Sequence, residues 1–278
     1  MRMIPDFQIE LTQATDYILD SKLARHALKE PPFLGFGNII RDTMEDIDRL
    51  ADNCHLPEFT DHALPHLCSM IKRISDWGWE GNEENKWGEK LGANEAAYLL
   101  LAILIHDIGM LSQDPAHLEI PAMINLPKGL ADVSNWVRTT HVRRMKKLYE
   151  QLLKDRGYED FSNSSDFDFI IALGCAHENW PWQERYKQVE TYAQKLVSVI
   201  KPSRAKGLAA VLAVADLLDE DANRCDTATL IKHRQGTTLN KAHWIRHALT
   251  EYVEIKQRKL FVKFVKPPRD WGRNGTSV

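Results

Sequence analysis

An uninterrupted apolar run at residues 96–105 constrains the fold of this chain more than any other feature. A helix made of such a run is apolar on every face, so we expect it to be buried on all sides at the centre of the fold. A membrane-spanning helix needs about 20 apolar residues, and this run is much shorter. The run therefore predicts a core helix, and we expect no association with a membrane.

The composition is that of an ordinary globular protein. The 278 residues are 44% hydrophobic and 27% charged, which is enough for one large domain, alone or with a small appendage. The net charge of −3 argues against a nucleic-acid coat but leaves nucleic acid open as a substrate. The four cysteines form no C-x-x-C pair, so a zinc knuckle is not expected, and the apolar surroundings of Cys68 and Cys175 suit a reducing compartment. The N-terminus has no signal-like apolar segment. We therefore expect a cytoplasmic protein.

Most of the remaining chain shows helical periodicity. Helices are predicted at residues 9–28, 38–50, 133–153, 165–177 and 204–223, the last capped by Ser203. Residues 252–255 and 260–265 alternate like two short strands around a turn. We predict an all-α fold with a small C-terminal antiparallel β-hairpin. Its expected parts are an N-terminal helical extension at 1–34, the core at 35–235, and the hairpin and tail at 236–278.

The apolar run ends in a histidine and an aspartate, His106 and Asp107. A carboxylate beside a buried helix is costly unless it has a partner, and a metal ion with other ligands nearby would explain it. A capping aspartate next to a packed histidine is the other explanation. Asp216 stands in a second apolar helical stretch, where a lone carboxylate also needs a partner.

Four more histidines are candidates for the same site. His62 and His66 have i, i+4 spacing and lie on one helix face, which could present one imidazole to a metal and the other to a substrate. Two exposed polar residues at a helix start would show the same spacing. His141 lies in the long basic helix, and His177 ends the helix predicted at 165–177. Each of these two, taken alone, is more often a structural histidine.

The order of these residues resembles that of the HD superfamily of metal-dependent phosphohydrolases. The matching segments are FTDHALPHL, LLLAILIHDIGM, TTHVRRM, CAHEN and AVADLLDEDANR, within residues 59–224. AILIHDIGM and VADLLDEDANR are the most specific, and they look closest to a bacterial branch associated with conflict and defence systems. The cyclic-di-GMP branch has a Gly-Tyr-Pro signature where this chain has Asn-Trp-Pro-Trp, so that specificity is not expected.

The resemblance implies a helical bundle with one or two metal sites. The residues in the positions of the first site are His66, His106, Asp107 and Asp216. By similarity to cyclic-nucleotide phosphodiesterases, His66 would bind metal and His62 would protonate the leaving group, although the reverse assignment stays open. In two-metal members the two intermediate histidines bind the second ion and the aspartate of the pair bridges both ions. Here these would be His141, His177 and Asp107.

Imidazole and carboxylate ligands suit a divalent transition metal, one or two ions of Mn, Fe, Ni, Co or Zn, or else Mg. A bound ion would activate water and polarise a phosphoryl oxygen, so Asp107 and His62 are the predicted catalytic residues. Arg138, Arg143 and Arg144 lie on the long basic helix and are the predicted substrate-binding residues. A solvated helix face would carry the same charges.

We therefore predict a phosphodiesterase or phosphatase (EC 3.1) acting on a nucleotide or a related small phosphorylated molecule. One alternative is a metal-dependent nuclease on single-stranded DNA or RNA, with Trp180, Trp182 and Tyr186 as candidate stacking residues. Another is a non-catalytic metal-binding interaction module. Five histidines and two aspartates exceed the four ligands of a closed structural site, which argues against the module. The oligomeric state and any protein partner stay open.

Overall fold

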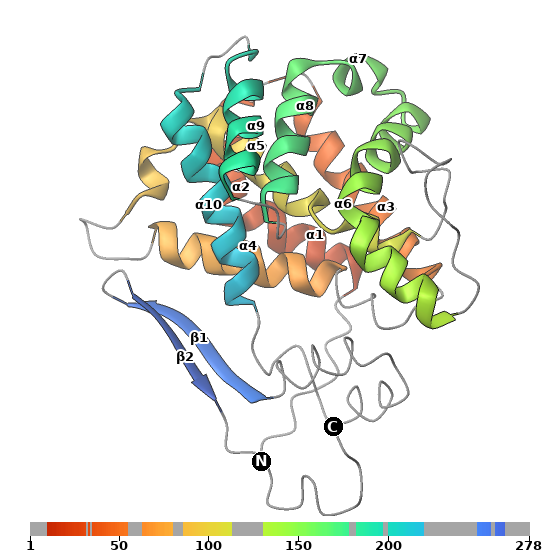
Figure 1. Ribbon diagram of the computed structural model, residues 1–278. Coiled ribbons are helices and arrows are strands. Elements are labelled where there is room, and N and C mark those ends of the chain that lie inside the picture. The colour runs from red at the N-terminus through yellow and green to blue at the C-terminus, as the bar shows by residue number, and fades with distance from the viewer. Residues whose placement is uncertain are drawn as a thin grey trace, which may run out of the picture. The chain divides into compact units, whose positions relative to one another are not determined.

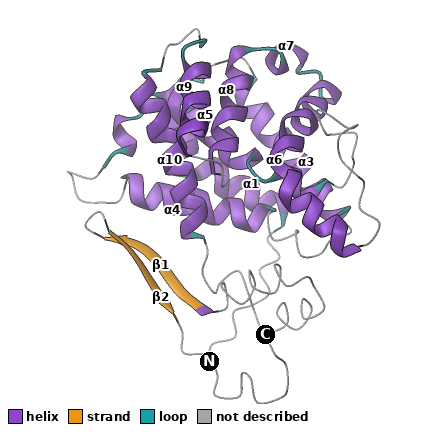
Figure 2. Ribbon diagram, viewed as in Figure 1, coloured by secondary structure: helices purple, strands orange, loops and turns teal. Residues whose placement is uncertain are grey.

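A computed structural model gives the structure of this chain. It describes residues 10–31, 33, 35–54, 63–79, 86–112, 130–177, 182–196, 200–219, 249–256 and 259–264. The chain divides into two compact units, with the boundary between Asp216 and Leu217. The first unit is helical and the second contains two strands, and each is described by itself (Figures 1 and 2).

The helical unit begins with α1 (Leu11–Asp20), α2 (Lys22–Ala27), α3 (Phe36–Asp52) and α4 (Leu64–Trp79). The short 3-10 helix η3 (Gly88–Lys90) leads to α5 (Ala93–Ile105), which is followed by the 3-10 helix η4 (Ile108–Leu111). Next come α6 (Leu130–Asp155), α7 (Glu159–Ser162), α8 (Ser165–Gly174) and the 3-10 helix η7 (Cys175–His177). The last helices are α9 (Trp182–Ala193) and α10 (Pro202–Leu218).

Helix α5 is the centre of this unit, as the apolar run predicts. Every residue from Glu95 to Ile105 is buried, and α5 packs against α2, α3, α4 and α8 (Figure 1). Among the described residues, the stretch Ala93–Leu111 alone is long and apolar enough to cross a membrane, but 94% of its apolar window is buried in the fold. The expectation of a core helix is confirmed.

Most predicted helices have ends that differ by a few residues in the structure, and two of these differences have a clear local cause. Residues 9–28 were expected to form one helix, but the chain is extended at Ser21 and starts α2 there. The Ser21 hydroxyl accepts a hydrogen bond from the Ala24 amide at 3.1 Å, so this serine caps a new helix. Helix α10 begins at Pro202, one residue before its predicted cap, because proline suits the first helical position.

The second unit contains a small antiparallel sheet. Strand β1 (Thr250–Lys256) pairs with β2 (Lys259–Phe264), with Val253 opposite Val262 and Ile255 opposite Leu260. The predicted all-α fold with one small C-terminal hairpin is therefore confirmed. The predicted domain limits stay a prediction, and residue 235 lies outside the described residues.

Candidate metal centre

The histidine-aspartate pair lies where the central helix ends. His106 follows the last residue of α5 and is completely buried, and Asp107 leads into η4 with 5% of its surface exposed. The Met110 amide donates to the Asp107 carbonyl at 2.7 Å, which turns the chain immediately after the pair. The fold thus holds an imidazole and a carboxylate at the end of its most buried helix.

A first group of four side chains meets at this point. It consists of His66 from α4, the pair itself and Asp216 from α10, whose ligand atoms all lie within 4.8 Å of one another. His66 Nε2 lies 3.3 Å from His106 Nε2 and 3.4 Å from Asp216 Oδ1. His106 Nε2 lies 3.4 Å from Asp107 Oδ2 and 3.7 Å from Asp216 Oδ1.

These distances fit atoms that share one ion. Ligand atoms about 2.0–2.2 Å from a common ion, at tetrahedral or octahedral angles, lie about 3–3.5 Å from each other. The donor set of two imidazoles and two carboxylates suits a divalent transition metal. Of the four side chains, only that of Asp216 has substantial exposure, 30%. The group is therefore buried but reaches solvent beside α10, as a catalytic site with an open position does.

A second group uses the other oxygen of the same aspartate. His177 Nε2 lies 3.4 Å and His141 Nε2 3.5 Å from Asp107 Oδ1, and the three residues form a separate candidate metal group. His141 comes from α6 and His177 from η7 at the end of α8. Asp107 therefore presents one oxygen to each group, which is the arrangement that the resemblance implied for two ions.

Three of the imidazoles are oriented by backbone carbonyls one turn earlier. The Nδ1 atom of His106 lies 2.8 Å from the carbonyl oxygen of Ile103. That of His141 lies 2.7 Å from the oxygen of Arg138, and that of His177 lies 2.6 Å from the oxygen of Gly174. A carbonyl only accepts, so each Nδ1 carries hydrogen. In the neutral ring Nε2 then carries the lone pair, and in each of the three residues Nε2 lies 3.4–3.5 Å from an oxygen of Asp107. Hydrogen bonds from Nδ1 to a backbone carbonyl are typical of metal-binding histidines, and a cation between Nε2 and the carboxylate would relieve their repulsion.

The pKa values of His106, His177 and Asp216 all shift in the direction that favours positive charge on the imidazoles and negative charge on the carboxylate. Burial lowers the pKa of His106, but the Asp107 and Asp216 carboxylates outweigh it and raise the pKa above 6.5. Burial also lowers the pKa of His177, yet the hydrogen bond to Asp107 raises it overall. For Asp216, burial raises the pKa, and bonds from His106 and His66 bring it well below its usual value. Protons on the imidazoles and metal ions are thus alternative sources of the charge.

Gly109 explains how α6 comes close enough to deliver His141. A Cβ at Gly109 would lie 2.1 Å from the carbonyl oxygen of His141 and 2.7 Å from its carbonyl carbon. A glycine that follows a helix commonly stops it, but α5 has already ended at Ile105 and Gly109 lies inside η4. Its missing side chain is needed for the contact between η4 and α6.

The structure brings together all six predicted metal ligands, but their roles stay predictions. His62, the predicted proton donor, lies outside the described residues. Of the stacking candidates for a nuclease, Trp180 and the side chain of Trp182 also lie outside what the structure describes, and Tyr186 is partly buried against the hydrophobic core.

The three predicted substrate-binding arginines have different settings. Arg143 is exposed on α6 and Arg138 is half-buried. Arg144 is completely buried, and its guanidinium bonds to the chain's own carbonyls, those of Ser112 and Val137. Substrate binding by Arg144 stays a prediction that this geometry does not favour.

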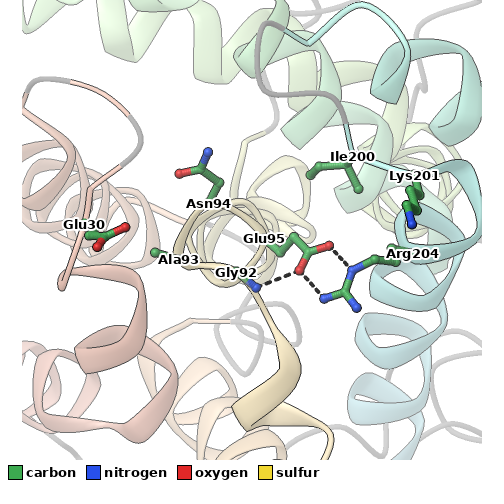
Figure 3. Close-up of a pocket in the computed structure, with 8 residues that line it drawn as sticks. All are labelled: Glu30, Gly92, Ala93, Asn94, Glu95, Ile200, Lys201 and Arg204. Atoms are coloured by element: carbon green, nitrogen blue, oxygen red, sulfur yellow. Dashed lines mark hydrogen bonds and ion pairs between the residues drawn. The ribbon is translucent and has the colours of Figure 1, made fainter.

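A pocket of about 530 Å³ lies at the opposite end of α5, about 20 Å from the pair by the length of the helix (Figure 3). It is lined by Glu30, Gly92, Ala93, Asn94, Glu95, Ile200, Lys201 and Arg204. Two of its charged side chains pair with each other: Glu95 binds the guanidinium of Arg204, and it also accepts a hydrogen bond from the Gly92 amide at 2.7 Å. This ion pair joins the start of α5 to α10.

The ion pair also helps to place Asp216. Asp107 lies twelve residues after Glu95, and Asp216 lies twelve residues after Arg204. The two helices are therefore joined at one end by the ion pair and meet at the other in the first metal group. We assign the pocket a structural part in the fold and the chemistry to the histidine and aspartate groups.

The comparisons with known proteins agree with this geometry. A family model named HD-CE matches residues 56–262, which include every histidine and aspartate of both groups. The searches of curated proteins and of solved structures return no match. The predicted link to conflict and defence systems stays a prediction, and the HD resemblance is confirmed. The chain belongs to the HD-CE family and carries an HD domain of the metal-dependent hydrolase kind.

Proposed function

We propose that this protein is a two-metal phosphohydrolase that cleaves phosphoester bonds in a nucleotide or a related small phosphorylated molecule. The single observation that carries the proposal is the position of Asp107. Its Oδ2 lies 3.4 Å from the nearest nitrogen of the first group, and its Oδ1 lies 3.4 Å from the nearest nitrogen of the second. One carboxylate between two ligand sets would suit the pair of neighbouring ions that two-metal hydrolases use.

The side chains of the centre would bind the ions, hold them in place and exclude most of the surrounding water. His66, His106 and Asp216 would complete the first site with Asp107, and His141 and His177 would complete the second. When bound, divalent ions supply Lewis acidity, which polarises a phosphoryl oxygen and lowers the pKa of water. The backbone bonds to Nδ1 keep the imidazoles from rotating, so the ligand geometry is set before any ion or substrate arrives.

Phosphate is the favoured substrate group because of the charges on α6. Arg138 precedes His141 by one helical turn, so the two residues share a face of the helix. A half-buried guanidinium on that face could bind a phosphate oxygen while the ions bind others. The exposed Arg143 could contact a more distant part of the substrate. His62 is our proposed proton donor to the departing oxygen.

The test is a metal titration coupled to a hydrolysis screen. Protein stripped with chelator is dialysed against Mn²⁺, Co²⁺, Ni²⁺, Zn²⁺ or Mg²⁺, and bound metal is counted by elemental analysis. Each form is then assayed on a phosphate monoester, a phosphate diester, nucleotides and single-stranded DNA and RNA. We expect two ions per chain, and hydrolysis of small phosphoesters faster than that of nucleic acid.

Matched variants separate the two ligand groups. His66→Ala should lose the first ion, and a His141→Ala, His177→Ala double variant should lose the second. His26→Ala is the control, because this histidine lies on α2 and bonds to the Leu91 carbonyl at 2.7 Å, apart from both groups. A stoichiometry near one that the double variant leaves unchanged would refute the two-metal centre. Rapid cleavage of single-stranded nucleic acid alone would support the nuclease instead.

A further inference from the structure

The contact between α6 and the turn after Asp107 contains a buried arginine. Arg144 has none of its surface exposed, and burial lowers the pKa of its guanidinium to about 10, so it remains a cation near neutral pH. Its guanidinium carbon lies 4.8 Å from the centre of the Trp136 ring. A fully buried cation is costly unless its donors are satisfied, so the position of these donors is informative.

The donors of Arg144 link two segments that carry metal ligands. Nη1 donates to the carbonyl of Ser112, which directly follows η4. Nε donates to the Thr140 hydroxyl and Nη2 to the Val137 carbonyl, both at 3.1 Å, on the part of α6 that precedes the arginine. Ser112 thus bonds across to the same helical turns that carry His141.

The bonds of Arg144 help to fix the distance between His141 and Asp107. The segment from Asp107 to Ser112 is short and hydrogen-bonded within itself, with Met110 bonded to Asp107, so fixing Ser112 also fixes Asp107. His141 lies one turn before Arg144 on the same rigid helix. The contact of Gly109 with the His141 backbone fixes the junction at a second point. Together these contacts set the 3.5 Å between His141 Nε2 and Asp107 Oδ1.

We propose that Arg144 is a positioning residue for the second metal group: it holds α6 against the turn after Asp107 and so sets the spacing of His141 and Asp107. The proposal rests on the two-metal function above. It reassigns Arg144 from contact with substrate to support of the centre. The first group shares Asp107, but it draws His66 from α4 and Asp216 from α10 and no ligand from α6, so it should depend on Arg144 less.

The test compares metal affinities in variants of the full chain. Arg144→Met keeps a long side chain but removes every donor, and Arg144→Lys keeps the charge with a single ammonium group. We expect Arg144→Met to bind the first Mn²⁺ with affinity within about threefold of wild type and the second at least about tenfold more weakly. Low-temperature electron paramagnetic resonance should show loss of the coupled Mn²⁺ pair. Arg144→Lys should fall between Met and wild type.

The matched control is Tyr149→Phe on the same helix. Tyr149 is as buried as Arg144, and its hydroxyl bonds to Thr43 at 2.9 Å, away from the centre. This variant should lower the melting temperature and keep both ions, which separates positioning from general loss of stability. If Arg144→Met does not fold, Thr140→Val replaces it, because this change removes the acceptor of Nε. The second ion should then bind several-fold more weakly.

The outcomes distinguish this inference from the proposed function. Wild-type protein that binds fewer than two ions overturns both. Wild-type protein that binds two ions, together with a folded Arg144→Met or Thr140→Val variant that binds both with unchanged affinity, leaves the function standing and overturns the role of Arg144.

Discussion

Replacing Gly109 with alanine should weaken the second metal site while the fold persists. The added Cβ would lie 2.1 Å from the His141 oxygen, whereas ordinary contacts begin near 3.4 Å. The backbone of α6 must therefore retreat by about 1.3 Å, since a backbone atom cannot rotate away as a side chain can. The distance between His141 Nε2 and Asp107 Oδ1 is 3.5 Å, so a shift of this size removes His141 from the position of a ligand.

The size of the effect follows from this displacement. A shift of about 1 Å in a catalytic group costs roughly 100-fold in rate, and loss of ligand support costs about 10–100-fold in metal affinity. Overpacking of this kind lowers the free energy of unfolding by about 1–3 kcal/mol. We therefore expect a folded Gly109→Ala protein with a lower melting temperature, a weak second ion and little hydrolysis.

The assay is calorimetric titration of Mn²⁺ into stripped protein, with chemical denaturation to confirm the fold. Gly207→Ala is the matched control, because Gly207 lies on α10, the helix of Asp216, and a Cβ there meets nothing within 4 Å. That alanine should leave metal binding unchanged and stabilise α10 slightly. A Gly109→Ala protein with two ions of wild-type affinity would refute the argument from close approach.

Four further predictions concern the same centre and its support. The apparent affinity for metal should begin to fall above pH 6.5 as the pH is lowered. The pKa values of His106 and His177 are raised above 6.5, so protons compete with metal at a higher pH than they would at an ordinary histidine. A metal affinity that is constant between pH 8 and 6 contradicts this. Removing metal with a chelator should lower the melting temperature, because a metal ion at a concentration 100 times its Kd adds about 2.7 kcal/mol to the free energy of unfolding. An unchanged melting temperature refutes this prediction. The His62→Ala variant should retain metal and lose turnover. If elemental analysis shows that this variant has lost metal, His62 is the ligand and His66 the proton donor. Leu101→Ala, at a fully buried position of α5, should cost about 2–5 kcal/mol in urea denaturation.

The central helix and the ligand set could be predicted because both depend on local pattern. Ten consecutive apolar residues can only be buried, and the polar pair that ends them had to be explained by a partner. The order of His66, His141, His177 and Asp216 around that pair then matched a known arrangement of ligands. Each of these signals lies within a few residues of its motif, so it can be read without knowing the fold.

The supports of the centre could not be predicted in the same way. Arg144 bonds to Ser112, thirty-two residues earlier, and nothing near either residue indicates that they meet. On an amphipathic basic helix, the natural interpretation of Arg144 was a phosphate contact. Stopping a helix is the commonest role of a glycine that follows one, and only the packing of α6 on η4 shows the close approach at Gly109.

The centre combines a cost and a benefit of burial in the same residues. Asp107 and Asp216 are carboxylates placed among core helices, and three imidazoles have their protons directed away from them by backbone bonds. Without a cation, the lone pairs and carboxylates would repel one another in a region of low dielectric. Protons can supply the positive charge, but a protonated Nε2 can no longer bind metal. Bound metal ions would supply the same charge and would also be able to activate water. The arrangement that places like charges and lone pairs together is therefore what should make the centre bind divalent ions. Such binding would stabilise the packing of all the helices that meet here, α4, α5, α6, α8 and α10.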